Sequence, residues 1–332
     1  MPPTPDAHAV ADAFGLAAPT GPLVPVRHVS SETWRLDTLR GRYFVKRLVF
    51  GDWRDQLEKA MAVELRARAA GLPTPLPVAP IDPAWGLAAD LGDGCGVLRV
   101  HAWLDGAPLA PGTDLSHWYG TTLAALHSLQ PAGPQRIDSM WPLWYGVYPP
   151  GTWDDWLATG LRQERPWAPL LKERLPLITD LAARIEAAYD EVGDYVLTHR
   201  DVVPHNVLMA TGGGPVLIDW DGAGPDSATL ETAAAVFDHA RHTTTGDPDP
   251  ARIASALATY RDHGGDLRPC GFLLARRLGV HLARCAERIR TSLGRETGGS
   301  PDPADADART ARQLAALPEF SSLLLDWSRR MG

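Results

Sequence analysis

Two kinds of hydrophobic pattern divide the chain. Apolar and polar residues alternate at 33–38 and 42–48, on either side of a turn at 39–41, and this alternation predicts a β-hairpin. Helical spacing of apolar residues predicts helices over 54–70, 115–129, 178–192, 228–242, 251–263 and 271–293. Because the strand-rich part ends near Val100, we expect one domain at 1–100 and a mostly helical domain at 101–332.

Three short β-prone runs interrupt the helical part, at residues 195–197, 207–209 and 216–218. A glycine-rich turn at 211–215 joins the last two. We expect the first two runs to pair and to hold the polar loop between them. The third run then brings the residue that follows it to the same end of the hairpin as that loop.

Three polar residues in and after this loop carry the chemistry of phosphoryl transfer. Asp201 can accept the proton of a hydroxyl group, and Asn206 lies five positions further on. Asp219 ends the last β-prone run, and with Asn206 it supplies the oxygen ligands that Mg²⁺ prefers. These residues could instead cap a turn and end a strand, but a plain hairpin does not require polar groups in this order.

The motifs in this region resemble those of a known family. The sequence H-R-D-V-V-P-H-N at 199–206 and the I-D-W at 218–220 are similar to the catalytic loop and metal segment of the aminoglycoside phosphotransferase and choline kinase family. These small-molecule kinases are related to protein kinases. Arg200 stands where the small-molecule kinases usually carry Gly, and His205 replaces a common Gly or Asp.

The resemblance implies a fold and a set of roles. The fold is α+β and two-lobed like that of protein kinases, with a small β-rich N-terminal lobe that binds the nucleotide. The larger, mostly helical C-terminal lobe carries the catalytic loop and the acceptor site. In this scheme Asp201 is the catalytic base, Asn206 and Asp219 are Mg²⁺ ligands, and His199 braces the loop.

Lys46, in the strand predicted at 42–48, is the candidate phosphate lysine. An ammonium group among apolar strand residues can reach the phosphates of a nucleotide, and it needs an acidic partner to hold it in place. Glu64 on the following helix is the best partner and resembles the helix glutamate that pairs with the strand lysine in kinases. Glu58 is the second choice. Taken alone, Lys46 could also be a solvated strand lysine.

Other nucleotide contacts follow from position in the family pattern. Ser30 and Ser31 form a turn where these kinases place a loop over the phosphates, although the glycine-rich sequence is missing. The segment 96–106 resembles the hinge that bonds adenine through its backbone. His101 and Trp103 are therefore candidate neighbours of the base, and packing in an interface is the alternative for Trp103.

Composition agrees with a cytoplasmic, soluble enzyme of 332 residues in which 45% of residues are hydrophobic and 22% are charged. The three cysteines are dispersed and lack metal-ligand spacing, which excludes a disulfide scaffold and a zinc site. No secretory signal and no apolar run of membrane-spanning length is visible. We expect no membrane partner and a monomer or weak dimer.

Charge is unevenly distributed along the chain. Residues 1–100 carry 11 basic and 11 acidic groups, so the net charge of −8 falls on residues 101–332. An acidic acceptor side suits a cationic molecule, and an acidic surface that aids solubility is the alternative. Because no basic stripe is visible, we expect no nucleic-acid partner.

Candidate acceptor residues lie in two regions, a Trp-rich loop before a helix with Thr152 as its cap, and the segment after the metal aspartate. They are Trp141, Trp144, Asp154, Asp155, Asp221, Asp226 and Glu231. Aromatic rings can stack on sugar or cationic faces, and carboxylates can bind amines. Trp153 and Trp156 are better explained as anchors of the helix, whereas Trp141 and Trp144 could serve either purpose.

These inferences lead to one functional hypothesis. We expect a phosphotransferase that uses ATP or GTP with Mg²⁺ to modify a hydroxyl of a small, cationic molecule, with antibiotic inactivation as the leading role. A metabolic kinase for choline, homoserine or a sugar is the alternative within enzymes. A nucleotide-binding or drug-sequestering protein without catalysis is the alternative outside them.

Overall fold

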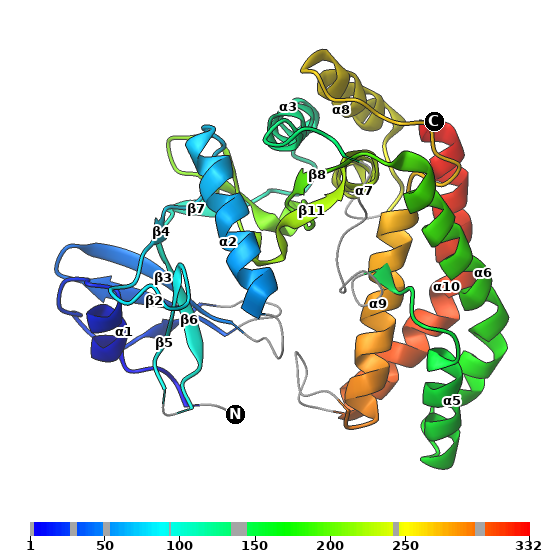
Figure 1. Cartoon of the computed structure of the whole chain (residues 1–332), viewed down its shortest axis with the longest axis horizontal. Helices are drawn as coiled ribbons and strands as arrows, with labels where there is room; N and C mark the ends of the chain where they lie inside the picture. The colour runs from blue at the N-terminus through cyan, green and yellow to red at the C-terminus, as the bar shows by residue number, and fades with distance from the viewer. Residues whose placement is uncertain are drawn as a thin grey trace. The chain divides into compact units, whose positions relative to one another are not determined.

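The computed structural model of the chain describes residues 3–26, 32–48, 54–92, 94–133, 145–241, 246–295 and 303–332. These residues form two compact units (Figure 1). The first unit combines Met1–Thr113 with His199–Gly224, and the second combines Asp114–Thr198 with Pro225–Gly332. This division differs from the boundary predicted at residue 100, because the segment with Asp201 and Asp219 gathers with the N-terminal strands.

The first unit is built on an antiparallel sheet with the strand order β1-β2-β3-β6-β4, in which β5 also pairs with β6. The elements of this part are α1 (Ala7–Ala13), β1 (Val24–Pro25), β2 (Thr33–Thr38), β3 (Gly41–Arg47), α2 (Arg54–Ala69), β4 (Pro77–Val78), β5 (Ala88–Asp90) and β6 (Val97–Ala102). The predicted hairpin is β2 and β3, paired from Thr33 opposite Lys46 to Thr38 opposite Gly41. The helix predicted at 54–70 is α2.

The two faces of this sheet have different neighbours. One face packs against α1 through a core that includes Val10, Phe14, Val45 and Leu98. Residues of α2 form a second cluster with Val97 and with strand β5. Since neighbouring strand residues point to opposite faces, the alternation along β3 and β6 directs polar side chains such as Lys46 away from the α1 core.

The segment His199–Gly224 adds a second sheet to the first unit. This sheet has the order β10-β9-β7, formed by β7 (Gly106–Pro108), β9 (Val207–Ala210) and β10 (Pro215–Leu217). At Gly106 a Cβ atom would lie 2.6 Å from the carbonyl oxygen of Met209, so the close approach of β7 and β9 requires glycine there. The hairpin predicted between 207–209 and 216–218 is confirmed as β9 and β10.

One predicted strand pair is wrong. The run at 195–197 is β8 (Tyr195–Thr198), which pairs with β11 (Gly224–Ser227) rather than with β9. All four residues of β8 are buried, and continuous apolar runs of this kind carry no alternation that would identify the partner strand. The loop that carries Asp201 therefore leads from one sheet to another instead of closing a hairpin.

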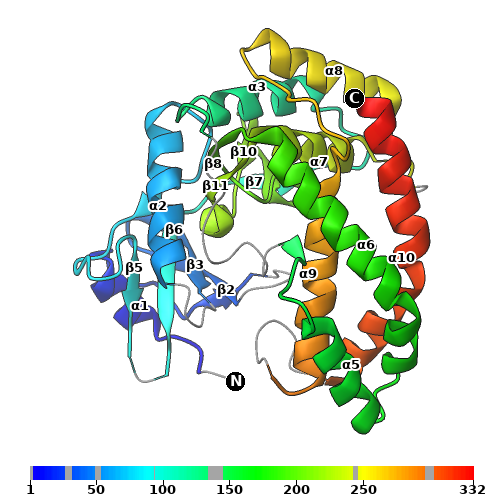
Figure 2. The ribbon, with the colours of Figure 1, turned by 45° about the vertical axis from the view of Figure 1, so that its right-hand side comes forward.

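The second unit is mainly helical. Its helices are α3 (Ser116–His127), α5 (Thr152–Arg162), α6 (Ala168–Val192), α7 (Ala228–Ala240), α8 (Pro250–Asp262), α9 (Ala275–Ser292) and α10 (Pro303–Met331). Helices α6, α9 and α10 lie side by side, and α3 packs against α8 (Figure 2). No helix of the described residues is both long enough and apolar enough to cross a membrane.

Helix boundaries differ from the sequence prediction at two places. Helix α6 begins at Ala168, ten residues before the predicted start, and includes Pro176 in its interior. Thr152 is the first residue of α5 and not its cap, because Gly151, at a φ of 82°, occupies the cap position.

A half-buried histidine on α9 makes the stability of the second unit depend on pH. Burial, followed by the charges of Arg277, Arg288 and Arg284, lowers the pKa of His281 from its usual 6.5 to about 4. Its Nε2 atom is buried and has no hydrogen-bond partner among the described residues. The unfolded chain takes up a proton near pH 6.5 and the folded chain only near pH 4, so acid in that interval favours unfolding.

We expect His281→Leu to remove this acid sensitivity. The variant has no imidazole to protonate, so the stability that the wild type loses between pH 6.5 and pH 4, on the order of 1–3 kcal/mol, should be retained. Thermal or urea unfolding across this pH range measures the difference. Parallel stability profiles for the variant and the wild type would contradict the assignment.

Candidate phosphoryl-transfer site

His199 braces the loop that carries Asp201. Its ring is buried, its Nε2 atom lies 3.0 Å from the carbonyl oxygen of Ile218, and its Nδ1 atom accepts the Asp201 backbone N–H at 3.3 Å. These contacts define the tautomer, because Nδ1 must be unprotonated to accept and Nε2–H then donates. The edge of the Trp220 indole closes the other side, with ring centroids 4.6 Å apart. One ring thus joins the catalytic loop to the end of β10.

Asn206 joins the other end of the loop to Asp201. It lies in a short 3₁₀ helix, Pro204–Asn206, and its Nδ2 atom donates to Asp201 Oδ2 at 2.7 Å and to the Asp201 carbonyl oxygen at 2.9 Å. The Oδ1 atom of Asn206 is buried and has no hydrogen-bond partner among the described residues. A buried amide oxygen without a donor is costly, so this atom is suited to bind a cation.

Asp219 reaches the same place from β10. The backbone N–H of Ile218 donates to the Asn206 carbonyl oxygen at 2.9 Å, which sets the residue after it beside the loop, as the sequence predicted. Asp219 has a positive φ of 65°, a conformation that disfavours a side chain. Local strain of this kind is common at functional sites. Its cause here is the sharp change of direction between β10 and the next turn, Trp220–Gly222.

Arg200 occupies the position where the family pattern has glycine, and its backbone explains that preference. Its φ is 65°, in the left-handed region that glycine adopts without strain. The guanidinium group is buried against Gly224, where a Cβ atom would lie 3.0 Å from Arg200 Nη1. The side chain thus fills space that a residue other than glycine at position 224 would occupy.

Lys46 pairs with two carboxylates that follow β10, Asp219 and Asp221. Its Nζ atom lies 2.6 Å from Asp219 Oδ1 and 2.7 Å from Asp221 Oδ2, and 12% of its side chain is exposed. Burial alone would lower the pKa of Lys46, but Asp221 and Asp219 outweigh burial and raise it above its usual value. Lys46 is therefore a fixed positive charge beside the Asp201–Asn206 pair.

The predicted pair between Lys46 and Glu64 is wrong in this structure. Both oxygens of Glu64 have other partners, since Oε2 pairs with Arg99 Nη2 and Oε1 lies 3.0 Å from His101 Nε2. Burial would raise the pKa of Glu64, but Arg99 and His101 hold it below its usual value. Glu64 thus stays ionised and is held by β6 rather than by β3.

Arg99 is a site residue that was not predicted from the sequence. It lies on β6, its side chain is 1% exposed, and its Nη1 atom lies 2.5 Å from Asp221 Oδ1. Asp221 was predicted to bind the acceptor, but it is held between Lys46 and Arg99, which keep its pKa below the usual value although burial opposes this. The signal was a single arginine in the apolar run Gly96-Val97-Leu98-Arg99-Val100, because a buried charge requires a partner.

The prediction that Asp226 and Glu231 bind the acceptor is also wrong. Both side chains are 1% exposed and serve the core of the second unit. Asp226 accepts the Tyr145 hydroxyl and pairs with Arg276 at 3.0 Å. Glu231 lies 2.8 Å from the Nε2 atom of His127. Carboxylates held by buried partners do not attract a ligand from solution.

Asp154 and Asp155 are exposed in the first turn of α5, and Asp155 pairs with Arg295 at 2.6 Å. They stay candidates for the acceptor. Trp153 and Trp156 are buried and pack edge to face at 5.0 Å, as expected of anchors. Four predicted contacts, Ser30, Ser31, Trp141 and Trp144, lie outside the described residues.

The segment 96–106, predicted as the hinge, consists of β6 and the residues that follow it. His101 contacts Glu64, as described above, and the Trp103 backbone N–H donates to the Arg42 carbonyl oxygen at 2.9 Å. The guanidinium carbon of Arg35 lies 5.9 Å from the centroid of the Trp103 ring. The role of His101 and Trp103 as neighbours of the base stays a prediction.

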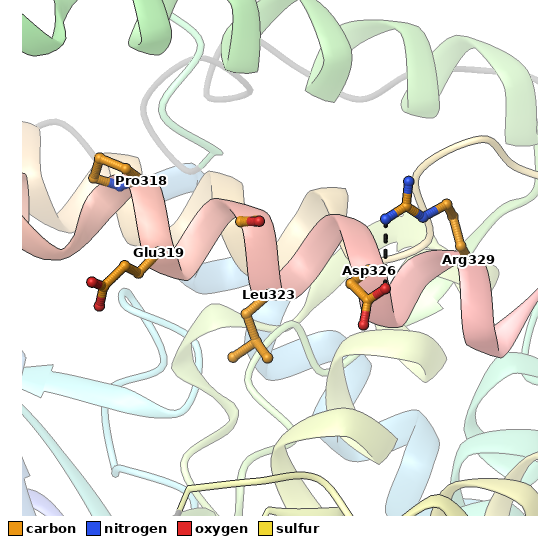
Figure 3. A pocket seen from close by; sticks show the side chains of 6 residues that line it. Pro318, Glu319, Leu323, Asp326 and Arg329 are labelled. Carbon is orange, nitrogen blue, oxygen red and sulfur yellow. Dashed lines mark hydrogen bonds and ion pairs between the residues drawn. The ribbon is translucent and has the colours of Figure 1, made fainter.

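A shallow surface pocket lies on α10 (Figure 3). It is lined by Pro318, Glu319, Ser322, Leu323, Asp326 and Arg329. Figure 3 shows Asp326 paired with Arg329 along one side of the helix. None of the predicted site residues lines this pocket, so it is not the candidate site.

Comparison with known sequences identifies the family. Residues 22–273 match the phosphotransferase enzyme family, and the chain therefore belongs to that family. The resemblance inferred from the motifs at 199–206 and 218–220 is confirmed. No curated protein matches the chain in a sequence search.

Solved structures share the fold at low sequence identity. A spectinomycin phosphotransferase in complex with ADP and spectinomycin is 13% identical, with a TM-score of 0.57 over 90% of this chain and 94% of that one. A microcompartment-associated aminopropanol kinase is 17% identical, with a TM-score of 0.59 over 96% and 98%. Choline kinase from Cryptosporidium parvum is 13% identical, with a TM-score of 0.57 over 92% and 90%. The predicted α+β, kinase-like fold is confirmed.

We expect Asp226→Asn to destabilise the chain severely. The substitution keeps the shape of the side chain but removes the carboxylate charge that lies 3.0 Å from the buried Arg276, at a cost of about 3–5 kcal/mol. Asp326→Asn is the matched control, because Asp326 pairs with Arg330 on the surface and such pairs contribute about 0–1 kcal/mol. Urea unfolding of both variants makes the comparison. Equal losses would show that the Asp226 pair is not structural.

Proposed function

We propose that this chain transfers the terminal phosphoryl group of a nucleoside triphosphate to a hydroxyl group of a small molecule. The observation that carries the proposal is the convergence of four groups within the first unit. Asn206 contacts Asp201 through its side chain and Ile218 through its backbone, and Lys46 pairs with Asp219. The proposed site of phosphoryl transfer thus combines a base, an amide oxygen, a second carboxylate and an ammonium group.

Asp201 is the proposed catalytic base. Its Oδ2 atom accepts the Asn206 Nδ2–H group, which fixes the plane of the carboxylate and leaves Oδ1 to accept the proton of the acceptor hydroxyl. His199 holds the backbone of the same residue. Positioning of the hydroxyl in line with the phosphorus atom contributes most in reactions of this class.

Asn206 and Asp219 are the proposed ligands of a divalent cation. The fit rests on the Asn206 Oδ1 atom, which is buried without a donor, and on the anionic Asp219 beside it. No group of three or more His, Cys, Asp or Glu side chains in the described part of the chain is arranged to hold a metal by itself. Bound Mg²⁺ neutralises charge on the phosphates, and it commonly completes its shell with phosphate oxygens and water.

Lys46 is the proposed contact to the nucleotide phosphates. An ammonium group with a raised pKa keeps its charge across the physiological range. One similar structure is named as a complex with ADP, which favours a nucleotide at this site. ATP and GTP both fit the contacts proposed here, with Ser30, Ser31, His101 and Trp103 as further neighbours of the nucleotide.

A small cationic molecule is the proposed acceptor, with an antibiotic as the leading class. Support comes from the charge of residues 101–332, with 21 basic and 29 acidic groups, and from the exposed Asp154 and Asp155. Names of the similar structures include an antibiotic kinase and metabolic kinases, so a metabolic role for choline, homoserine or a sugar is the alternative. A thermal-shift screen of nucleotides and acceptors with Mg²⁺, followed by product mass measurement, distinguishes these classes.

We expect Asp201→Asn to lower kcat by ~10² or more while nucleotide affinity is retained, because the amide cannot accept the hydroxyl proton. Asp37→Asn, which alters a carboxylate paired with Arg35 on β2, is the matched control and should keep kcat. Steady-state kinetics and equilibrium nucleotide binding measure both effects. Turnover near the wild-type value in Asp201→Asn would remove this residue from its role.

We expect the acceptor KM to rise with salt, because exposed carboxylates attract a cation over a Debye length of about 8 Å at physiological ionic strength. The double variant Asp154→Asn/Asp155→Asn should raise the acceptor KM at low salt and leave the nucleotide KM unchanged. Asp180→Asn/Asp266→Asn removes two other exposed, arginine-paired carboxylates and is the matched control. An acceptor KM that is insensitive to salt would favour a neutral acceptor such as a sugar.

A further inference from the structure

A continuous row of ion pairs connects Lys46 to helix α2. The row begins at Asp219 and passes through Lys46, Asp221 and Arg99 to Glu64, where His101 adds a final contact. Each internal member touches two neighbours of opposite charge. The strand lysine and the helix glutamate are therefore connected, but only through two intervening side chains.

Arg99 is the member of this row with the least freedom. Its guanidinium group is 1% exposed and contacts Asp221 through Nη1 and Glu64 through Nη2. A planar guanidinium group can donate to two carboxylates at a fixed angle, which a lysine ammonium group cannot reproduce. The position of Asp221 thus depends on where α2 holds Glu64.

In the proposed reaction Asp219 would share its carboxylate between Lys46 and a divalent cation, because it is also the proposed ligand of that cation. Glu64 is already occupied on both oxygens. Asp221 is the second carboxylate that contacts the Lys46 ammonium group, at 2.7 Å, and it is not a proposed ligand of the cation. A long lysine stem loses rotamer freedom only when such a partner holds its end.

We infer that Asp221 and Arg99 are positioning residues for Lys46, with Arg99 linking Glu64 of α2 to Asp221 and Asp221 holding the ammonium group. The inference rests on the proposed function, in which Lys46 contacts the nucleotide phosphates. The helix glutamate thus acts on the lysine through a relay of two side chains. Displacement of α2 would move Glu64, Arg99 and Asp221 together and would change the place of Lys46.

Binding of a non-hydrolysable ATP analogue, and of its GTP counterpart, in the presence of Mg²⁺ tests the relay. Arg99→Lys loses the double contact and Asp221→Asn loses the charge, so each should weaken binding about tenfold, the effect expected for one charge-assisted hydrogen bond. The double variant should be no weaker than either single one, because the relay is already interrupted. Glu64→Gln should weaken binding in the wild-type background but not in Asp221→Asn.

Two outcomes of the double-variant measurements would overturn the relay. Additive losses in Arg99→Lys/Asp221→Asn, about a hundredfold in total, would mean that the two residues act independently. An undiminished effect of Glu64→Gln in the Asp221→Asn background would mean that Glu64 acts on Lys46 directly. A wild type that binds neither analogue would instead contradict the proposed function, and the two failures are thus distinguishable.

Arg47→Lys is the matched control for damage to the sheet. Arg47 follows Lys46 on β3, is similarly buried, and pairs with Glu32 and the Pro3 carbonyl oxygen. Adjacent strand residues point to opposite faces, so this variant should lower the Tm and leave analogue affinity unchanged. If Arg47→Lys lost as much affinity as Arg99→Lys, both losses would be explained by general damage to the sheet. That result would overturn the relay.

Discussion

The amide group of Asn206 is the contact on which the candidate site depends. Its nitrogen donates twice to Asp201, and the backbone oxygen of the same residue accepts from Ile218, which precedes Asp219. The proposed base and the proposed metal carboxylate are therefore both placed by one residue, which immediately precedes β9. Because the β9–β10 hairpin has a fixed register, the residues at its two open ends, Asn206 and Asp219, stay close together.

Much of the first unit could be predicted from the sequence. The alternation that gives β2 and β3 follows from local rules of strand formation. The roles expected of Asp201, Asn206 and Asp219 came from the resemblance of their motifs to a kinase family. The partner of β8 could not be predicted, since a fully buried run has no polar face to indicate its neighbour. The same limit applies to Lys46, because charge pairing across strands depends on three-dimensional proximity and not on spacing along the chain.

Counting charges misled the assignment of acceptor residues. Asp221, Asp226 and Glu231 contribute to the negative balance of the helical part, but each is held by a partner from a distant part of the chain. A carboxylate that is neutralised in the interior contributes little field at the surface. Such residues differ from Asp154 and Asp155 only in being buried. The residues next to an acidic side chain in the sequence do not show whether it is buried.

The packing of Arg200 on Gly224 couples two positions that are 24 residues apart in the sequence. Glycine adopts the left-handed backbone of position 200 without strain. Here an arginine adopts it, and its guanidinium group packs beside position 224. A Cβ atom at position 224 would lie 3.0 Å from Arg200 Nη1, so the guanidinium group would have to move to make space for it. We therefore expect glycine at 200 to accompany a larger residue at 224.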